Sequence, residues 1–254
     1  MEPWRTAITT SDETHIWLRG YEIQPLMTKA TFTDTIFLLF KERLPTPDER
    51  RLMDAILIAS TDHGPGSPSA ATARLAANGN RESFSAALAA GILAIGDAHG
   101  GAGEACMEMI AAGVGLAHRE SLSIPEAAQR VLDEARASGR RLPGLGHRTH
   151  TADPRKQVLF TLAREGNLAG EGVAWMQALE DRVRTQIKPL PVNVDGALAA
   201  VLHDLGFPPP AGKLLFIIGR VAGLAVEVLE EHTREKPMRV KIPVVYDGVP
   251  PKEF

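Results

Sequence analysis

The chain has 254 residues, of which 44% are hydrophobic, and its formal net charge is -3. This length and apolar content allow one large globular domain or two smaller ones, and the charge offers no basic field for binding nucleic acid. The single cysteine, Cys106, excludes an internal disulfide and a cysteine-rich zinc site, and we expect no metal. Residues 1–19 carry scattered charges without the apolar core of a signal peptide, and no apolar run is long enough to cross a bilayer. We therefore expect a cytoplasmic protein without a membrane partner.

The first part of the chain predicts a short hairpin or extended arm followed by helices. Residues 11–21 are polar, with β-branched and aromatic residues and an Arg-Gly pair that favours a turn. Apolar residues at helical spacing then predict helices over 33–42 and 48–60. Two runs rich in Ala, Ser, Leu and Gly predict buried helices that pack closely, over 67–77 and 83–95.

The rest of the chain keeps the helical pattern, which predicts an all-α fold. The expected helices cover 104–116, 125–138, 153–166, 172–185, 195–205 and 213–231. In the first of them we expect Ala105, Met109, Ile110 and Ala112 to face inward. The tail over 232–254 is rich in proline and basic residues, and we expect an irregular arm that lies on another surface.

Three short motifs each place one proton-transfer side chain beside residues that let a ligand come close. They are Asp97-Ala98-His99-Gly100-Gly101, Gly144-Leu145-Gly146-His147-Arg148 and Asn193-Val194-Asp195-Gly196. His99 precedes a predicted helix, whose positive dipole end disfavours an imidazolium and favours a neutral donor. Two imidazoles and one carboxylate suffice to make and unmake an enol beside a carbonyl without a metal, which indicates carbon–carbon bond chemistry.

Arginines at two places in the sequence suggest an anionic ligand. The loop over 139–146 combines Arg140 and Arg141 with three glycines, so it can present positive charge and backbone groups to an anion, although the two cations could merely keep the loop soluble. Arg220 lies in the middle of a mostly apolar helix. Because an unpaired buried guanidinium is costly, Arg220 should face an anion, either a substrate carboxylate or an Asp or Glu of the chain.

Six short segments stand in one order along the chain. They are Thr61–Pro65, Gly91–Asp97, Gly144–Arg148, Asp153–Arg155, Asn193–Gly196 and Gly219–Arg220 with Gly223. Together they resemble the citrate synthase superfamily, and most of all the citryl-CoA lyase module of ATP-citrate lyase. The resemblance implies an all-α fold with a larger oligomerising domain, 1–100 and 195–254, and a smaller mobile domain, 101–194, that carries a CoA and catalytic loop over 139–155.

The resemblance implies a catalytic set of His99, His147 and Asp195. His147 resembles the histidine that shuttles the proton of the carbonyl or tertiary hydroxyl, and Asp195 the carboxylate that exchanges a proton with the acetyl methyl carbon. His99 matches the histidine of the synthases that donates to the thioester oxygen, a position at which the ATP-citrate lyase module lacks histidine. The segment from His147 to Arg155 is one residue shorter than in common synthases.

The resemblance also implies binding residues. His63 resembles a histidine that binds the citrate or oxaloacetate group, although it could instead cap the preceding helix. Arg155, Arg220 and Arg239 resemble arginines that clamp substrate carboxylates, the last of them from a neighbouring subunit, unless Arg239 belongs to a solvated tail. The residues expected at the CoA thioester are Arg140, Arg141, Gly144, Gly146 and Arg148.

The implied activity is cleavage of (3S)-citryl-CoA to acetyl-CoA and oxaloacetate by an enzyme with no tightly bound cofactor. CoA thioester and a tricarboxylate or 2-oxoacid would be its small-molecule partners, and a homodimer or higher homo-oligomer is expected. One alternative is a short citrate-synthase-like enzyme that condenses an acyl-CoA with a 2-oxoacid, and a related one cleaves a different 3-hydroxyacyl-CoA. Another is a non-catalytic subunit that binds CoA or an organic acid. The chain shows no ATP-grasp region, so we do not expect it to activate citrate itself.

Overall fold

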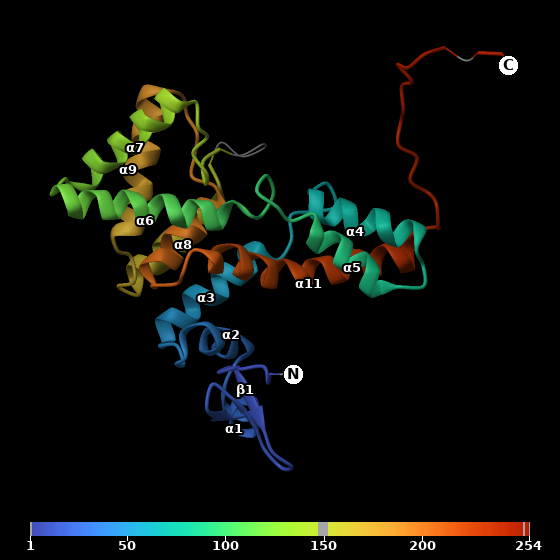
Figure 1. Ribbon diagram of the computed structural model, residues 1–254, viewed down its shortest axis with the longest axis horizontal. Helices are drawn as coiled ribbons and strands as arrows, with labels where there is room; N and C mark the ends of the chain where they lie inside the picture. Colours follow the sequence, from blue (N-terminus) through green and yellow to red (C-terminus); the bar gives the residue numbers. More distant parts are fainter. Residues whose placement is uncertain (1, 147–151, 251, 254) are drawn as a thin grey trace.

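A computed structural model of the chain describes residues 2–146, 152–250 and 252–253. Within these ranges the protein is built almost entirely of helices, with one small antiparallel sheet near the N-terminus (Figure 1). The expected helical fold class and the N-terminal hairpin are therefore confirmed. Within the described ranges, none of the helices combines the length and the apolarity needed to span a membrane.

The N-terminal sheet consists of β1 (Thr9–Ser11), β2 (Ile16–Leu18) and β3 (Tyr21–Glu22), paired in that order. The Asp12 carboxylate closes the first turn by accepting the backbone N–H groups of Thr14 and His15, at 2.8 and 2.7 Å. Arg19 then ties the sheet to the helical body, because its guanidinium donates twice to the carbonyl oxygen of Leu39.

The helices begin where the sequence supplies capping residues. Thr31, Thr46 and Ser123 each form a capping box with the acidic residue three positions later, which satisfies backbone N–H groups that the first helical turn leaves unpaired. The helices are α1 (Ile23–Lys29), α2 (Phe32–Lys41), α3 (Pro47–Ser60), α4 (Pro68–Gly79), α5 (Phe84–Leu93), α6 (Ala102–Glu120), α7 (Ile124–Ser138), α8 (Pro154–Glu165), α9 (Glu171–Gln186), α10 (Val194–Asp204) and α11 (Pro210–Arg234).

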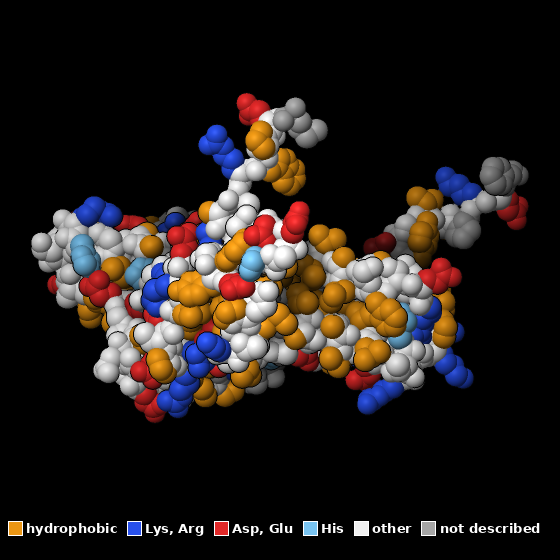
Figure 2. All heavy atoms as spheres, turned by 90° about the horizontal axis from the view of Figure 1, so that it is seen from below, with side chains coloured by type: hydrophobic (Ala, Val, Ile, Leu, Met, Phe, Trp, Pro, Cys, Tyr) orange, Lys and Arg blue, Asp and Glu red, His pale blue; other side chains and the backbone are white. Residues whose placement is uncertain are grey.

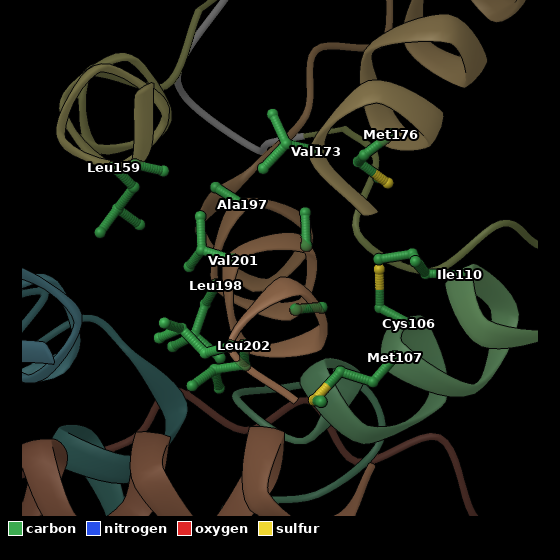
Figure 3. Close-up of a cluster of buried hydrophobic side chains, with 14 of the residues drawn as sticks. Cys106, Met107, Ile110, Leu159, Val173, Met176, Ala197, Leu198, Val201 and Leu202 are labelled. Carbon is green, nitrogen blue, oxygen red and sulfur yellow. The ribbon is translucent and has the colours of Figure 1, made fainter. Parts of the chain in front are cut away.

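The main core surrounds α10. Its residues 196–202 are all buried, and it packs against α6, α8 and α9 and less extensively against α11 and α3. Figure 3 shows Ala197, Leu198 and Val201 of α10 between Leu159 of α8 on one side and α6 on the other. Such a helix cannot shift without opening the core, so the residues at its N-terminus have a fixed position.

A second cluster joins α4, α5 and α11, on the right in Figure 1. Small residues bring these helices close together: a Cβ atom on Gly91 would lie 2.8 Å from the Cβ of Ala73. The outer side of this group stays apolar and exposed, with Phe84 and Leu93 of α5 at 54% and 84% and Val226 of α11 at 61%. Figure 2 shows hydrophobic side chains gathered over this half of the molecule. The chain beyond α11 is the expected irregular arm: it first bonds to the body, where the N–H of Met238 donates to the carbonyl oxygen of Asn78, and then extends away (Figure 1). That the arm lies on another surface stays a prediction.

The inward face of α6 differs from the sequence prediction. Ile110 is buried and Met109 partly buried, but Ala105 and Ala112 are exposed. The buried side instead contains Gly113, where an added Cβ would lie 2.4 Å from the ring of Trp175 in α9. The buried face of α6 is thus the one on which glycine leaves room for the tryptophan ring, and Ala105 and Ala112 lie outside it.

Candidate active site

The loop that leads to His147 is bound to the segment that leads to Asp195. Gly146 donates its N–H to the carbonyl oxygen of Pro191 at 2.7 Å, and Asn193 donates its N–H to the carbonyl oxygen of Gly144 at 3.0 Å. Gly144 has φ +80°, and a Cβ there would lie 2.7 Å from the Cα of Gly196, so only glycine allows this approach. The glycines of two motifs therefore meet at the first turn of α10.

Asn193 fixes this junction with its side chain. Its Oδ1 accepts the N–H of Gly196 at 3.1 Å as the N-cap of α10, and its Nδ2 donates to the carbonyl oxygen of Gly146 at 2.8 Å. Asp195, in the first turn of the helix, is thereby held beside the loop over 144–146. His147 and Arg148 follow Gly146 directly in sequence, and both lie outside the described residues.

Asp195 has an unusual acidity. Burial raises the pKa of its carboxyl group from an ordinary 3.8 to about 6, against the positive charges of Arg155 and Arg220, which act to lower it. The nearby charge of Asp153 adds to the rise. A carboxyl group with such a pKa exchanges protons readily near neutral pH, which suits a general acid or base.

His99 and Arg220 share one serine. The Nε2 atom of His99 lies 3.2 Å from the backbone N–H of Ser69, which donates to it, and 2.9 Å from the Ser69 hydroxyl oxygen. That hydroxyl oxygen also accepts the Nη1–H of Arg220 at 3.0 Å, so its own proton can point to His99. Because a backbone N–H can only donate, Nε2 must be the acceptor. A neutral His99 therefore carries its proton on Nδ1, an assignment made from the hydrogen bonds.

Arg220 is almost fully buried, with 1% of its surface exposed. Its Nε–H donates to the carbonyl oxygen of Ser60 at 2.9 Å, and its guanidinium lies 4.9 Å from the centre of the Phe216 ring. Burial lowers the pKa of Arg220, while the charges of Asp62 and Asp195 act in the opposite direction. In the described part of the chain no Asp or Glu accepts a hydrogen bond from Arg220, so the anion expected from the sequence is not a directly bonded carboxylate of these residues.

Arg155 reaches the same place from another helix. Its Nη1–H donates to the carbonyl oxygen of Ala59 at 3.3 Å, next to the carbonyl that receives Arg220. Asp153, the N-cap of α8, accepts its Nε–H at 3.0 Å and its Nη2–H at 2.8 Å. Two guanidinium groups are thus anchored on consecutive carbonyls at the C-terminal end of α3, where the helix dipole favours cations. A pair of arginines fixed side by side can bind two carboxylates.

His63 is exposed on the segment that follows α3, as the sequence predicted, three residues after Ser60, whose carbonyl oxygen receives Arg220. Its role in substrate binding stays a prediction. Arg239 is placed elsewhere in the chain: it forms a two-pronged ion pair with Glu231 at 3.0 and 2.6 Å and contacts Glu235 at 3.0 Å. Glu231 lies eleven residues beyond Arg220 on α11, about 16 Å along the helix axis. Within one chain, Arg239 is therefore not part of the group around Asp195.

Arg140 and Arg141 lie where two cavities meet. One, of about 510 Å³, lies between α7 and α9 and has an apolar floor, with Arg136 and Lys188 as further cations. The other, of about 610 Å³, lies between α6 and α7. Among its described lining residues, the first cavity combines apolar surface with four cations and no carboxylate, so it suits a ligand with an apolar part and phosphates.

Three residues of the site were not predicted from the sequence: Ser60, Ser69 and Asp153. Asp153 opens the Asp-Pro-Arg segment, and an Asp before a proline is a sequence signal for a helix N-cap. Ser69 follows another such start, Ser67-Pro68, but nothing in the sequence shows that its side chain points to His99 and Arg220. Ser60 contributes a backbone carbonyl, which no sequence pattern reveals.

The family model for the citrate synthase C-terminal domain matches residues 45–241. The chain belongs to the citrate synthase family. A curated citrate synthase from Heyndrickxia coagulans is 26% identical over 238 residues, which cover 92% of this chain and 60% of that protein. A probable ATP-citrate synthase from Caenorhabditis elegans is 30% identical over 174 residues, 66% of this chain and 15% of that protein. This family member thus spans at most 60% of the length of these curated relatives.

Among solved structures, a citryl-CoA lyase from Hydrogenobacter thermophilus is 37% identical with a TM-score of 0.90, and the match covers 100% of this chain and 98% of that one. A mutant ATP citrate lyase from Methanosaeta concilii in complex with (3S)-citryl-CoA has a TM-score of 0.79 at 20% identity, over 97% of this chain and 43% of that one. The second similarity shows the fold alone. The first extends the family assignment over the whole chain.

Proposed function

We propose that this citrate synthase family member is a citryl-CoA lyase that cleaves (3S)-citryl-CoA to acetyl-CoA and oxaloacetate. The observation that carries the proposal is the shared serine: Ser69 links the His99 imidazole to the buried Arg220, 2.9 and 3.0 Å away. A carboxylate-binding cation and a neutral hydrogen-bond donor are thereby fixed relative to one another. Similarity over the full length to a citryl-CoA lyase supports the same conclusion.

In the proposed reaction His147 takes the proton of the citryl hydroxyl while the bond between the carbinol carbon and the methylene carbon breaks. The electrons of that bond pass to the thioester, which leaves as the enolate of acetyl-CoA, and oxaloacetate retains the new carbonyl. His99, protonated on Nδ1, stabilises the enolate oxygen by donating a hydrogen bond and keeps its proton. Asp195 delivers a proton to the methylene carbon, for which a pKa of about 6 leaves a usable protonated fraction at neutral pH. No step in this sequence calls for a metal or a tightly bound cofactor.

Arg155, Arg220 and His63 would hold the carboxylates of the substrate. Both arginines already have their orientation fixed by the end of α3, so little conformational entropy is lost when the carboxylates bind. For the CoA moiety we propose the loop of Arg140, Arg141, Gly144, Gly146 and Arg148, together with the cavity between α7 and α9.

We also propose a homodimer or higher homo-oligomer, formed through the exposed apolar side of α5 and α11 and the C-terminal arm. Phe84, Leu93 and Val226 would be covered there. A role for Arg239 in the active site of a neighbouring subunit remains a prediction, and it requires Arg239 to leave the buried Glu231. The division into a large domain, 1–100 and 195–254, and a mobile domain, 101–194, also remains a prediction, as does the cytoplasmic location.

The test is the release of oxaloacetate from (3S)-citryl-CoA, followed through malate dehydrogenase and NADH. We expect turnover that Asp195→Asn reduces at least a hundredfold. The second candidate, a short citrate synthase, is favoured by the curated relatives of that name. It predicts instead the release of free CoA from acetyl-CoA and oxaloacetate, detected with a thiol reagent. A third candidate, a non-catalytic subunit, predicts binding of CoA without turnover in either assay.

A further inference from the structure

The segment over 190–193, which leads into α10, is held on both of its edges. On one edge Pro191 and Asn193 bond to the loop over 144–146, as described above. Neighbouring residues of an extended chain point their backbone groups in opposite directions, so the N–H of Val192 faces the other way. There it donates to Oε1 of Glu180 at 2.7 Å.

Glu180 also connects this segment to α8. Its second oxygen, Oε2, accepts the Nζ–H of Lys156 at 2.5 Å, and Lys156 follows the substrate-binding Arg155 directly in sequence. The two side chains are only 17% and 23% exposed. One carboxylate on α9 therefore contacts the segment before Asp195 and the helix that carries Arg155. The proposed mechanism assigns Glu180 no chemical role.

We propose that Glu180 is a positioning residue that sets the place of Asp195 relative to the loop over 144–146 and to Arg155. The inference rests on the proposed function. Val192 is fully buried, so without Glu180 its N–H would lack both a protein acceptor and bulk water. The segment would have to move to satisfy it, and Asn193, the N-cap of α10, would move with it. Displacements of about 1 Å in a reacting group can cost about a hundredfold in rate.

A cavity of about 460 Å³ adjoins this carboxylate and makes the proposal testable by chemical rescue. Its lining includes Glu180 together with Asp153, Lys156, Arg184 and Pro191. When Glu180 is replaced by alanine, the space left by its side chain adds to this cavity. Formate, a carboxylate without a side chain, could then enter and accept hydrogen bonds from Val192 and Lys156.

The experiment compares Glu180→Ala, Glu180→Gln and the control Asp181→Ala in the oxaloacetate-release assay. Asp181 is the next residue on α9, 68% exposed and paired with Arg184, so its replacement removes the same charge without touching the segment over 190–193. We expect Glu180→Ala to lower kcat at least tenfold with KM changed less than threefold. Glu180→Gln, which keeps an acceptor for Val192, should recover most of kcat, and formate should raise the activity of Glu180→Ala but not that of Asp181→Ala.

Amide hydrogen exchange over 144–146 and 190–196 gives a readout that needs no activity. Exchange should accelerate at least tenfold in Glu180→Ala, slow again with formate, and stay unchanged in Asp181→Ala. If a folded Glu180→Ala keeps the exchange rates of the parent, the inference is wrong, whatever the assay shows. If the parent releases no oxaloacetate, the proposed function fails, and the exchange rates alone then show whether Glu180 positions the segment over 190–193. If Glu180→Ala does not fold, Glu180→Gln decides: kcat and exchange that both stay near the parent values, or that change together, support the inference, and a tenfold fall in kcat with unchanged exchange overturns it.

Discussion

Replacing Asp195 by asparagine should make the protein more stable at neutral pH while lowering its activity at least a hundredfold. Burial raises the pKa of this carboxyl group from 3.8 to about 6. Each pKa unit corresponds to about 1.4 kcal/mol, so keeping Asp195 ionised in the folded state costs about 3 kcal/mol at a pH well above 6. Asparagine has a similar shape and no charge, so it avoids this cost. The native Asp195 thus lowers the stability of the folded protein, and the same burial raises its pKa into the range that a general acid needs.

The sign of the pH dependence follows from the direction of the shift. Because the pKa is higher in the folded state, the folded protein binds more protons than the unfolded chain between pH 3.8 and about 6. The contribution of Asp195 to stability is fully present below pH 3.8 and is lost as the pH rises through about 6. The cost of ionisation is about 1.6 kcal/mol at pH 5 and about 3 kcal/mol at pH 8. The advantage of Asp195→Asn should therefore grow by about 1.4 kcal/mol between these two pH values.

Urea unfolding of the parent and of Asp195→Asn at pH 5 and pH 8 measures this difference. Asp181→Asn, at an exposed carboxylate, serves as the control, and its effect should change by less than about 0.5 kcal/mol between the two pH values. An advantage of Asp195→Asn that is equal at both pH values, or smaller at pH 8, would refute the reasoning. It would mean that the two arginines compensate the charge of Asp195 fully.

Three further predictions concern the arginine and histidine groups and the exposed apolar surface. Ser69→Ala removes a buried acceptor of Arg220, so the free energy of unfolding should fall by about 1.5–3 kcal/mol and kcat by at least tenfold. A change below about 0.5 kcal/mol in urea unfolding would contradict the proposed link between Arg220 and His99 through Ser69. In the lyase direction Asp195 must be protonated, so kcat should fall about tenfold per pH unit above about 6, and a profile flat from pH 6 to 8 would exclude Asp195 as the acid. Val226→Arg places a charge on the exposed side of α11 and should shift light scattering towards the mass of one chain; an unchanged mass would place the subunit interface elsewhere.

The fold class and most helix positions could be predicted from the sequence, because they depend on local information. The helical spacing of apolar residues acts within a few residues, and the structure places α3 and α7 where this spacing predicted helices. The family motifs likewise stand in the sequence as short, contiguous segments. Cys106, the single cysteine of the sequence, is fully buried and packs in the main core.

Tertiary structure alone decided which side chains meet. Ala105 and Ala112 fit an inward face of α6 by spacing, but the buried face is the one on which Gly113 meets Trp175, more than sixty residues away in sequence. Arg155 and Arg220 converge because they donate to the consecutive backbone carbonyls of Ala59 and Ser60. Every residue has a backbone carbonyl, so the sequence does not show which carbonyls accept these hydrogen bonds. Local propensities act along the chain, whereas hydrogen bonds and steric fit at a site join segments whose separation in sequence carries no information about their distance in space.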